Sequence, residues 1–112
     1  MFNFKDFSQL GGLLKEAMQI KQKIEVVKEE LARLEIEGEA GGGLVKVKMN
    51  GKFEIISISL SDELFAEGMN DKSLIEALVL SAFNITSEKV KSIAKEKMKE
   101  VAGGIEIPGI ID

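Results

Sequence analysis

The chain has 112 residues, 15 of them basic and 19 acidic, and its net charge of −4 argues against a protein that coats nucleic acid through a strong positive field. It contains no Cys and no His, so disulfides, thiolate metal sites and the commonest general base are excluded. We therefore expect no enzyme: no catalytic residues, no metal, no cofactor and no small-molecule substrate. The length predicts a single domain over residues 1–112.

The N-terminal region has no targeting signal and is rich in aromatic residues. No basic segment precedes an apolar one, and no run approaches the roughly 18 apolar residues of a membrane span. We expect a cytoplasmic protein without a membrane partner. Three Phe residues open the chain: Phe2, Phe4 and Phe7. Only Lys5 lies among them, so we expect them to tether this end to the fold or to a partner subunit rather than to stack on bases.

A long amphipathic helix is predicted from about Ser8, as its N-cap, to Glu35. Its apolar positions alternate three and four residues apart: Leu10, Leu13, Ala17, Ile20, Ile24, Val27, Leu31 and Leu34. Such a heptad helix would be about 42 Å long, whereas a compact domain of this size has a radius of gyration of about 13 Å. The helix must project or lie along a second subunit, and we expect a homodimer. The flanking charges disfavour a simple parallel zipper, so packing of part of this seam on the sheet or the second helix is an alternative.

Three antiparallel strands in a meander are predicted next. Residues 35–40 alternate and are interpreted as a short edge strand whose outward Glu residues deter edge-to-edge association. Gly41-Gly42-Gly43 is interpreted as a tight turn, because it precedes a strand and lacks the ending of a phosphate loop. Asn50-Gly51, between two alternating segments, predicts a hairpin with a type I′ turn.

Two registers are possible for this hairpin. A two-residue loop sets Val45 opposite Ile56. A three-residue loop ending at Lys52 sets Met49 opposite Phe53, Val47 opposite Ile55 and Lys48 opposite Glu54, which suits cross-strand pairing better. The second register requires a bulge at Ile55-Ile56 to bring the apolar residues onto one face.

A second long helix is predicted after a short capped turn. Ser61 caps the turn through Phe65, and Ser73 with Glu76 forms a capping box that opens the helix. The segment 74–85 is apolar nearly all round, which predicts burial. From Thr86 onward one face is apolar: Val90, Ile93, Ala94, Met98 and Val101. Gly103-Gly104 ends the helix, and we expect the apolar tail that follows to dock on the body or across the dimer.

Lys91, Lys95 and Lys99 form an i, i+4 stripe on the other face of this helix. Three lysines in line can follow a phosphate backbone. Such a stripe is also typical of a solvated face, and three glutamates partly neutralise it: Glu88, Glu96 and Glu100.

Four features of the sequence resemble one family: the block GEAGGGLVKV at residues 38–47, the Asn50-Gly51 turn, Asn84, and the ending GGIEIPG at residues 103–109. They are similar to the YbaB/EbfC family of bacterial nucleoid-associated proteins over essentially the whole chain. Ser61-Asp62-Glu63 departs from the Asp-Pro-Glu usual there. The resemblance implies a two-layer α+β fold of order α-β-β-β-α with a three-stranded antiparallel meander, a tweezer-like homodimer, and binding of double-stranded DNA in the nucleoid.

The DNA-binding residues that we expect are lysines of the two long helices, acting as phosphate neutralisers with weak sequence preference. The candidates are Lys15, Lys21, Lys23, Lys28, Lys91, Lys95 and Lys99. The implied role is nucleoid organisation or gene regulation. The alternative is a protein-interaction module that engages a partner protein through its heptad helix and apolar C-terminal tail.

Overall fold

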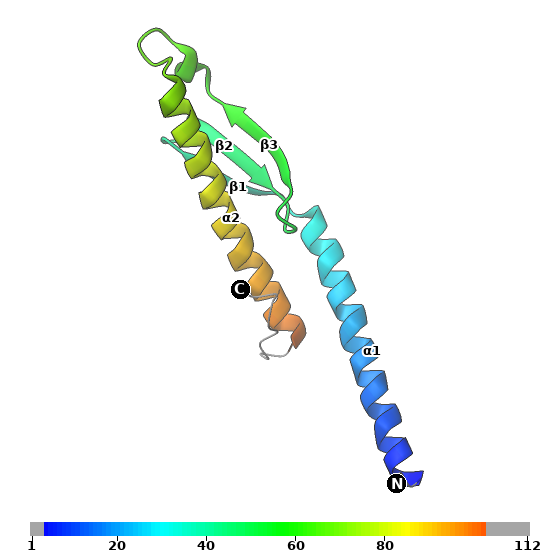
Figure 1. Cartoon of the computed structure of the whole chain (residues 1–112). Helices are drawn as coiled ribbons and strands as arrows, with labels where there is room; N and C mark the ends of the chain where they lie inside the picture. The colour runs from blue at the N-terminus through cyan, green and yellow to red at the C-terminus, as the bar shows by residue number, and fades with distance from the viewer. Residues whose placement is uncertain (1–3, 103–112) are drawn as a thin grey trace.

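The structure, a computed structural model, describes residues 4–102, with side chains described over residues 9–101. The elements follow the order α1 (Phe4–Arg33), β1 (Ile36–Ala40), β2 (Val45–Met49), β3 (Ile55–Leu60), the 3-10 turn η1 (Asp62–Phe65) and α2 (Lys72–Ala102). This order confirms the predicted α+β fold, with α2 and the sheet as its two layers (Figure 1). The predicted tether of Phe2, Phe4 and Phe7 and the predicted docking of the tail lie outside the described side chains.

The three strands form an antiparallel meander in the order β1-β2-β3, as predicted. Alternate residues of β1 and β2 are buried beneath α2: Ile36, Gly38, Ala40, Val45, Val47 and Met49. On the other face, Glu37 lies opposite Lys48 and Glu39 lies opposite Lys46, so opposite charges are paired across the strands. The period-two pattern therefore separates a core face from a charged face.

Both predicted registers of the β2–β3 hairpin are wrong. Met49 pairs with Ile55, whereas Lys48 pairs with Ser57, so Ile56 is skipped and the predicted bulge is confirmed. The loop is longer than either prediction because the Asn50 side chain organises it. Its Oδ1 accepts hydrogen bonds from the N–H of Lys52 at 2.9 Å and of Glu54 at 3.1 Å. These bonds replace the predicted type I′ turn.

Gly51 is required for close packing rather than for a positive φ, which in this loop belongs to Phe53 at 64°. The N–H of Gly51 donates to the carbonyl oxygen of Leu31 at 2.7 Å. A Cβ at this position would lie 2.8 Å from the same oxygen. The hairpin is thereby attached to the last turns of α1.

The cap of helix α2 lies two residues earlier than predicted, at Asp71 instead of Ser73. The Asp71 carboxylate, not Ser73, accepts the first free N–H groups, from Ser73 at 3.0 Å and from Leu74 at 3.3 Å. Glu76 pairs with Lys72 at 3.8 Å instead of closing a capping box. The predicted cap of η1 is confirmed, because Ser61 Oγ accepts from the N–H of Glu63 at 3.3 Å. Ser8 is not an N-cap either, since α1 already begins at Phe4 and no helix breaker lies between them.

Helix α2 packs most closely on the sheet at its middle. The Thr86 hydroxyl is fully buried and lies 2.7 Å from the carbonyl oxygen of Ala82 and 3.3 Å from that of Val47. Gly38 leaves the space for it, because a Cβ there would overlap with Thr86.

The predicted burial of residues 74–85 holds within this chain for one side of the helix only: Ala82 is buried, and Ile75, Leu78 and Val79 are half-buried. Leu80 is 62% exposed, and Leu74, Phe83 and Ile85 are also exposed. Helix α2 covers β1 and β2, while all six residues of β3 are exposed at the edge of the sheet. A sheet covers only the side of a helix that faces it, so the other sides of this segment stay exposed within one chain.

Helix α1 projects from the body, as its length predicted (Figure 1). The molecule measures 80 × 21 × 18 Å, with a radius of gyration of 21.5 Å. Among the described side chains, coverage of the seam is confined to its C-terminal part, where Val27 and Leu31 pack on Met98 of α2. Toward the N-terminal end the apolar residues are exposed: Leu10, Leu13, Leu14, Met18 and Ile20. Within residues 4–102, neither helix combines the length and apolar composition needed to span a bilayer.

Candidate nucleic-acid interface

The C-terminal half of α2 carries the basic stripe. Lys91, Lys95 and Lys99 follow one another at about 6 Å along the helix axis. Lys91 and Lys99 are exposed and Lys95 is half-buried. Among the described side chains none of the three forms a salt bridge, so their charges are available to an anionic partner.

Two further lysines of α2 are used inside the fold. Lys97 pairs with Glu30 of α1 at 3.5 Å and is only 30% exposed. The Lys89 ammonium donates to the carbonyl oxygen of Glu37 in β1 at 2.9 Å. These lysines hold α2 to α1 and to β1. The sequence already indicated an internal role for Lys97, because it lies between Ala94 and Val101 on the apolar face of the helix.

The four candidate lysines of α1 do not form one cluster. Lys21 and Lys28 are seven residues apart and share a side, whereas Lys23 lies about 200° round the helix from Lys21. Lys28 also lies 3.8 Å from Glu25, in an exposed pair that stabilises little. From residue 15 to 33 the helix carries five basic and four acidic residues, so its field is weak.

The opposite end of the molecule is acidic. From η1 to the first turns of α2, the chain carries a single basic residue, Lys72, and five acidic residues: Asp62, Glu63, Glu67, Asp71 and Glu76. Figure 1 places η1 at the far end of the long axis from the tip of α1. The molecule is therefore electrically polarised along its length, and a polyanion is repelled from the η1 end.

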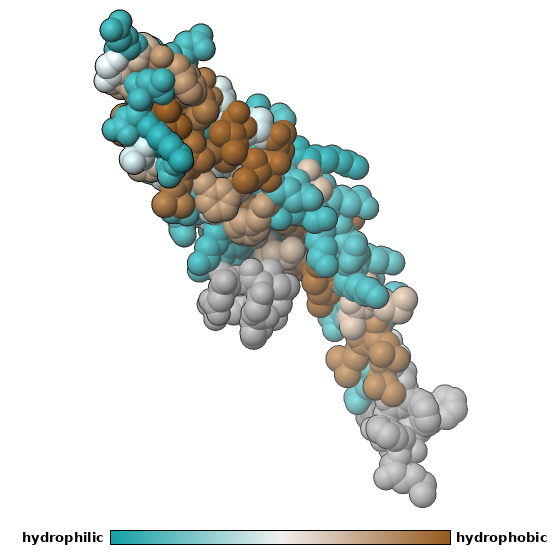
Figure 2. Space-filling view, turned by 45° about the horizontal axis from the view of Figure 1, so that its top comes forward, coloured by the Kyte–Doolittle hydropathy of each residue, from teal (hydrophilic) through white to brown (hydrophobic). Residues whose placement is uncertain are grey.

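An apolar groove of about 410 Å³ lies between β3 and the N-terminal half of α2. Apart from Glu76, its lining is hydrophobic: Ile55, Ile58, Ile75, Val79, Leu80 and Phe83. The outer edge of β3 pairs with no other strand of the described chain. Figure 2 shows hydrophobic side chains gathered on the body, and a second group toward the end of the α1 arm.

Over the described residues, carboxylates nowhere gather in a group of three or more that could hold a metal ion. The lysine stripe, the apolar groove and the projecting helix α1 are the surface features on which a binding function can be built.

Comparisons with known proteins identify the family. The YbaB/EbfC DNA-binding family matches residues 6–105. A nucleoid-associated protein of Anaeromyxobacter dehalogenans strain 2CP-1 is 44% identical over 98 residues, covering 88% of this chain and 93% of that protein. One from strain 2CP-C is 41% identical over the same shares. The crystal structure of an uncharacterized Helicobacter pylori protein matches with a TM-score of 0.70 and 27% identity, covering 92% of this chain and 100% of that chain. The chain therefore belongs to the YbaB/EbfC DNA-binding family.

Proposed function

We propose that the protein binds double-stranded DNA as a homodimer, mainly through phosphate contacts and with weak sequence preference, in nucleoid organisation or gene regulation. Family membership and the naming of the Anaeromyxobacter relatives as nucleoid-associated proteins support DNA as the ligand. The observation that carries the proposal is the stripe of Lys91, Lys95 and Lys99, which no described carboxylate neutralises in a salt bridge.

The apolar groove beside β3 supports the proposal of a dimer. Contiguous exposed apolar surface marks an interaction site, and an exposed strand edge is open to pairing. Here the two coincide: Ile58 of β3 is 49% exposed and Leu80 of α2 is 62% exposed. A second copy joined through the same face around a two-fold axis would cover both. This arrangement leaves the lysine stripes of both subunits outside the interface.

We expect contacts to phosphates rather than to bases because the chain is rich in lysine and has a single arginine. The commonest specific contact to a base pair is an arginine bidentate to guanine, and Arg33 is the only arginine of the chain. Lysines act as point charges on phosphates. A dimer would present six stripe lysines, enough to neutralise about six phosphates.

Salt-dependent binding tests this function. The affinity of the purified protein for a random duplex and for duplexes selected from a random pool should fall roughly 10³-fold between 50 and 200 mM salt if six phosphates are contacted. The random and selected duplexes should bind with similar affinity. Failure to bind any duplex at 50 mM salt would refute the proposal.

The alternative function is a protein-interaction module, and the end of α1 favours it. Leu13 is 63% exposed and Met18 is 63% exposed on a helix that projects into solvent. Under this alternative, pull-down with the full chain recovers one partner in stoichiometric amount, Leu13→Asp abolishes its recovery, and DNA binding is absent. Retention of the partner by Leu13→Asp would exclude this part of α1 as its site.

A further inference from the structure

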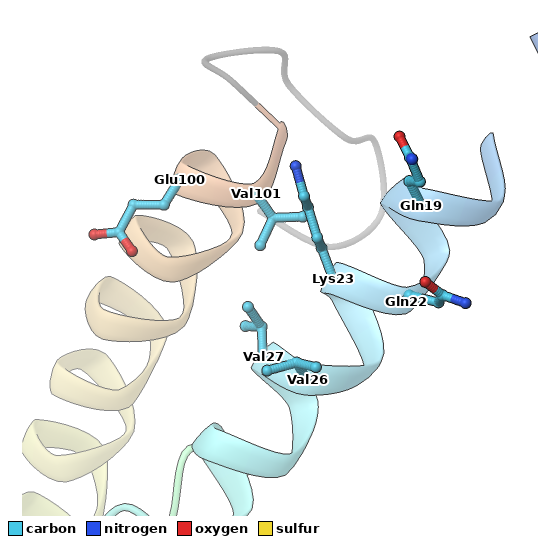
Figure 3. A pocket seen from close by; sticks show the side chains of 7 residues that line it. All are labelled: Gln19, Gln22, Lys23, Val26, Val27, Glu100 and Val101. Carbon is cyan, nitrogen blue, oxygen red and sulfur yellow. The ribbon is translucent and has the colours of Figure 1, made fainter. Parts of the chain in front are cut away.

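A second groove, of about 720 Å³, lies between α1 and the end of α2. Its lining comes from both helices: Gln19, Gln22, Lys23, Val26 and Val27 of α1, with Glu100 and Val101 of α2. Figure 3 shows the three valines on the facing sides of the helices, with Lys23 reaching between them. The groove shares no lining residue with the one beside β3, so the proposed dimer does not account for its apolar surface.

The chain supplies a segment of matching chemistry at the rim of this groove. Val101 lines the groove, and the chain continues past Ala102 as GGIEIPGIID, residues 103–112. Gly103 and Gly104 allow a reversal of direction after a helix, because glycine adopts the left-handed conformation readily. In an extended segment, Ile105 and Ile107 then lie on one side and Glu106 on the other.

We propose that residues 103–112 dock in this groove of their own chain, with Ile105 and Ile107 on Val26, Val27 and Val101. Lys23 at the rim offers a partner of opposite charge to Glu106. The side-chain amides of Gln19 and Gln22 offer donors and acceptors to the backbone of the segment. The docked segment ties α1 to the end of α2, beyond the point where the two helices pack directly.

The segment after Val101 is long enough to cover the groove. Six residues from Val101 to Ile107 span up to about 20 Å when extended. The lining residues of α1, from Gln19 to Val27, extend over about 12 Å of helix axis. The segment can therefore cover the groove from its rim without displacing either helix.

Disulfide trapping tests the docking, and the absence of native cysteine makes the result unambiguous. In Val26→Cys/Ile107→Cys, docking brings the two Cα atoms within the roughly 7 Å that a disulfide needs. Val26 is 53% exposed, so the substitution leaves the core intact. Under mild oxidation we expect a disulfide within one chain, identified by intact mass and peptide mapping.

The matched control is Lys28→Cys/Ile107→Cys. Lys28 is two residues further along α1, about 200° round the helix, and its side chain is 55% exposed. The Val26 variant should close on the order of tenfold faster, because docking raises the effective concentration of the two thiols. Adding Ile105→Asp should slow it to the control rate.

Three results would overturn the docking: equal rates in the two variants, no effect of Ile105→Asp, or a disulfide that joins two chains. The trapping is done without DNA. Its outcome therefore does not depend on whether the protein binds DNA.

Discussion

The two halves of α2 differ in what covers them. The C-terminal half is amphipathic, and its apolar face packs on α1 of the same chain through Met98. The N-terminal half is apolar on nearly every side, yet Leu80 and Phe83 are exposed. The C-terminal half thus packs on both β1 and α1 of its own chain, whereas the N-terminal half leaves apolar side chains exposed that the proposed dimer would cover.

The same division separates two kinds of binding. The apolar half adjoins the open edge of β3, which suits a protein surface. The other half presents lysines, which suit a polyanion. The proposed dimer and the proposed DNA contact therefore use different parts of one helix, and variants can separate them.

Removal of the lysine stripe should change DNA binding more than any other substitution described here. Replacement of Lys91, Lys95 and Lys99 by Ala should lower the slope of log affinity against log salt by roughly five, since about 0.9 is lost per phosphate contact and a dimer loses six. Fluorescence anisotropy with labelled duplex measures this slope.

The matched control for the stripe removes three lysines from the sheet and its loop: Lys46, Lys48 and Lys52. The change in net charge is the same. An equal loss of slope in this control would show that the contacts are not concentrated on α2.

On the apolar half, Leu80→Asp should separate the subunits. A charge at the centre of an apolar interface should raise the dimer dissociation constant roughly 100-fold, about 3 kcal/mol. Sedimentation equilibrium measures the shift toward the monomer mass. Ser92→Asp, an exposed position in the other half, should leave the mass unchanged. A dimeric Leu80→Asp would exclude this face as the interface.

Gly38 of β1 contacts α2 at Thr86, where the two halves of the helix meet, and Gly38→Ala should weaken the packing of α2 on the sheet. The added Cβ would meet the backbone nitrogen of Thr86 at 2.9 Å, so the free energy of unfolding should fall by about 2 to 3 kcal/mol. Urea unfolding measures the loss. Gly12→Ala is the control and should raise the free energy of unfolding by roughly 0.5–1 kcal/mol, because Gly12 lies in a helix and an added Cβ would have no atom within 4 Å.

The smallest expected effect is a gain of affinity. Glu88 lies one turn before Lys91 and is exposed, so Glu88→Ala removes a negative charge beside the stripe. Affinity for duplex DNA at low salt should rise roughly twofold to threefold, and the gain should disappear as salt screens it. Glu63→Ala, at the η1 end, should change nothing; a gain there would argue against binding along the α2 stripe.

Sequence patterns predicted the elements whose partners lie within the chain. The heptad spacing of α1 predicted a helix longer than a compact domain, so that it had to project or to lie along a second subunit. The alternation of apolar and polar residues in β1 and β2 predicted which face of the sheet is buried. Burial of residues 74–85 was predicted for every side of the helix but is found within the chain on one side only, because an apolar composition does not show which molecule covers a segment.

Local details were harder because neighbouring residues offered the same chemistry. Asp71 and Ser73 are both good helix caps, and the path of the loop decided between them. Asn50-Gly51 marked the hairpin correctly, but the side-chain bonds of Asn50 set a loop length that the pattern did not show. Among the lysines of α2, only the contacts of Lys97 and Lys89 distinguish those that hold the fold from those that are free to bind.

The hydrogen bond from Gly51 to Leu31 attaches the C-terminal end of α1 to the hairpin, so the angle of the whole helix is set near this point. A helix of 30 residues is about 45 Å long, so a rotation of one degree about that point moves its tip by roughly 0.8 Å. A tilt of about 7° displaces the tip by a full helical turn. In the proposed dimer, the distance between the tips of the two α1 helices would therefore depend on this angle, and small changes in packing around residues 31 and 51 would alter it.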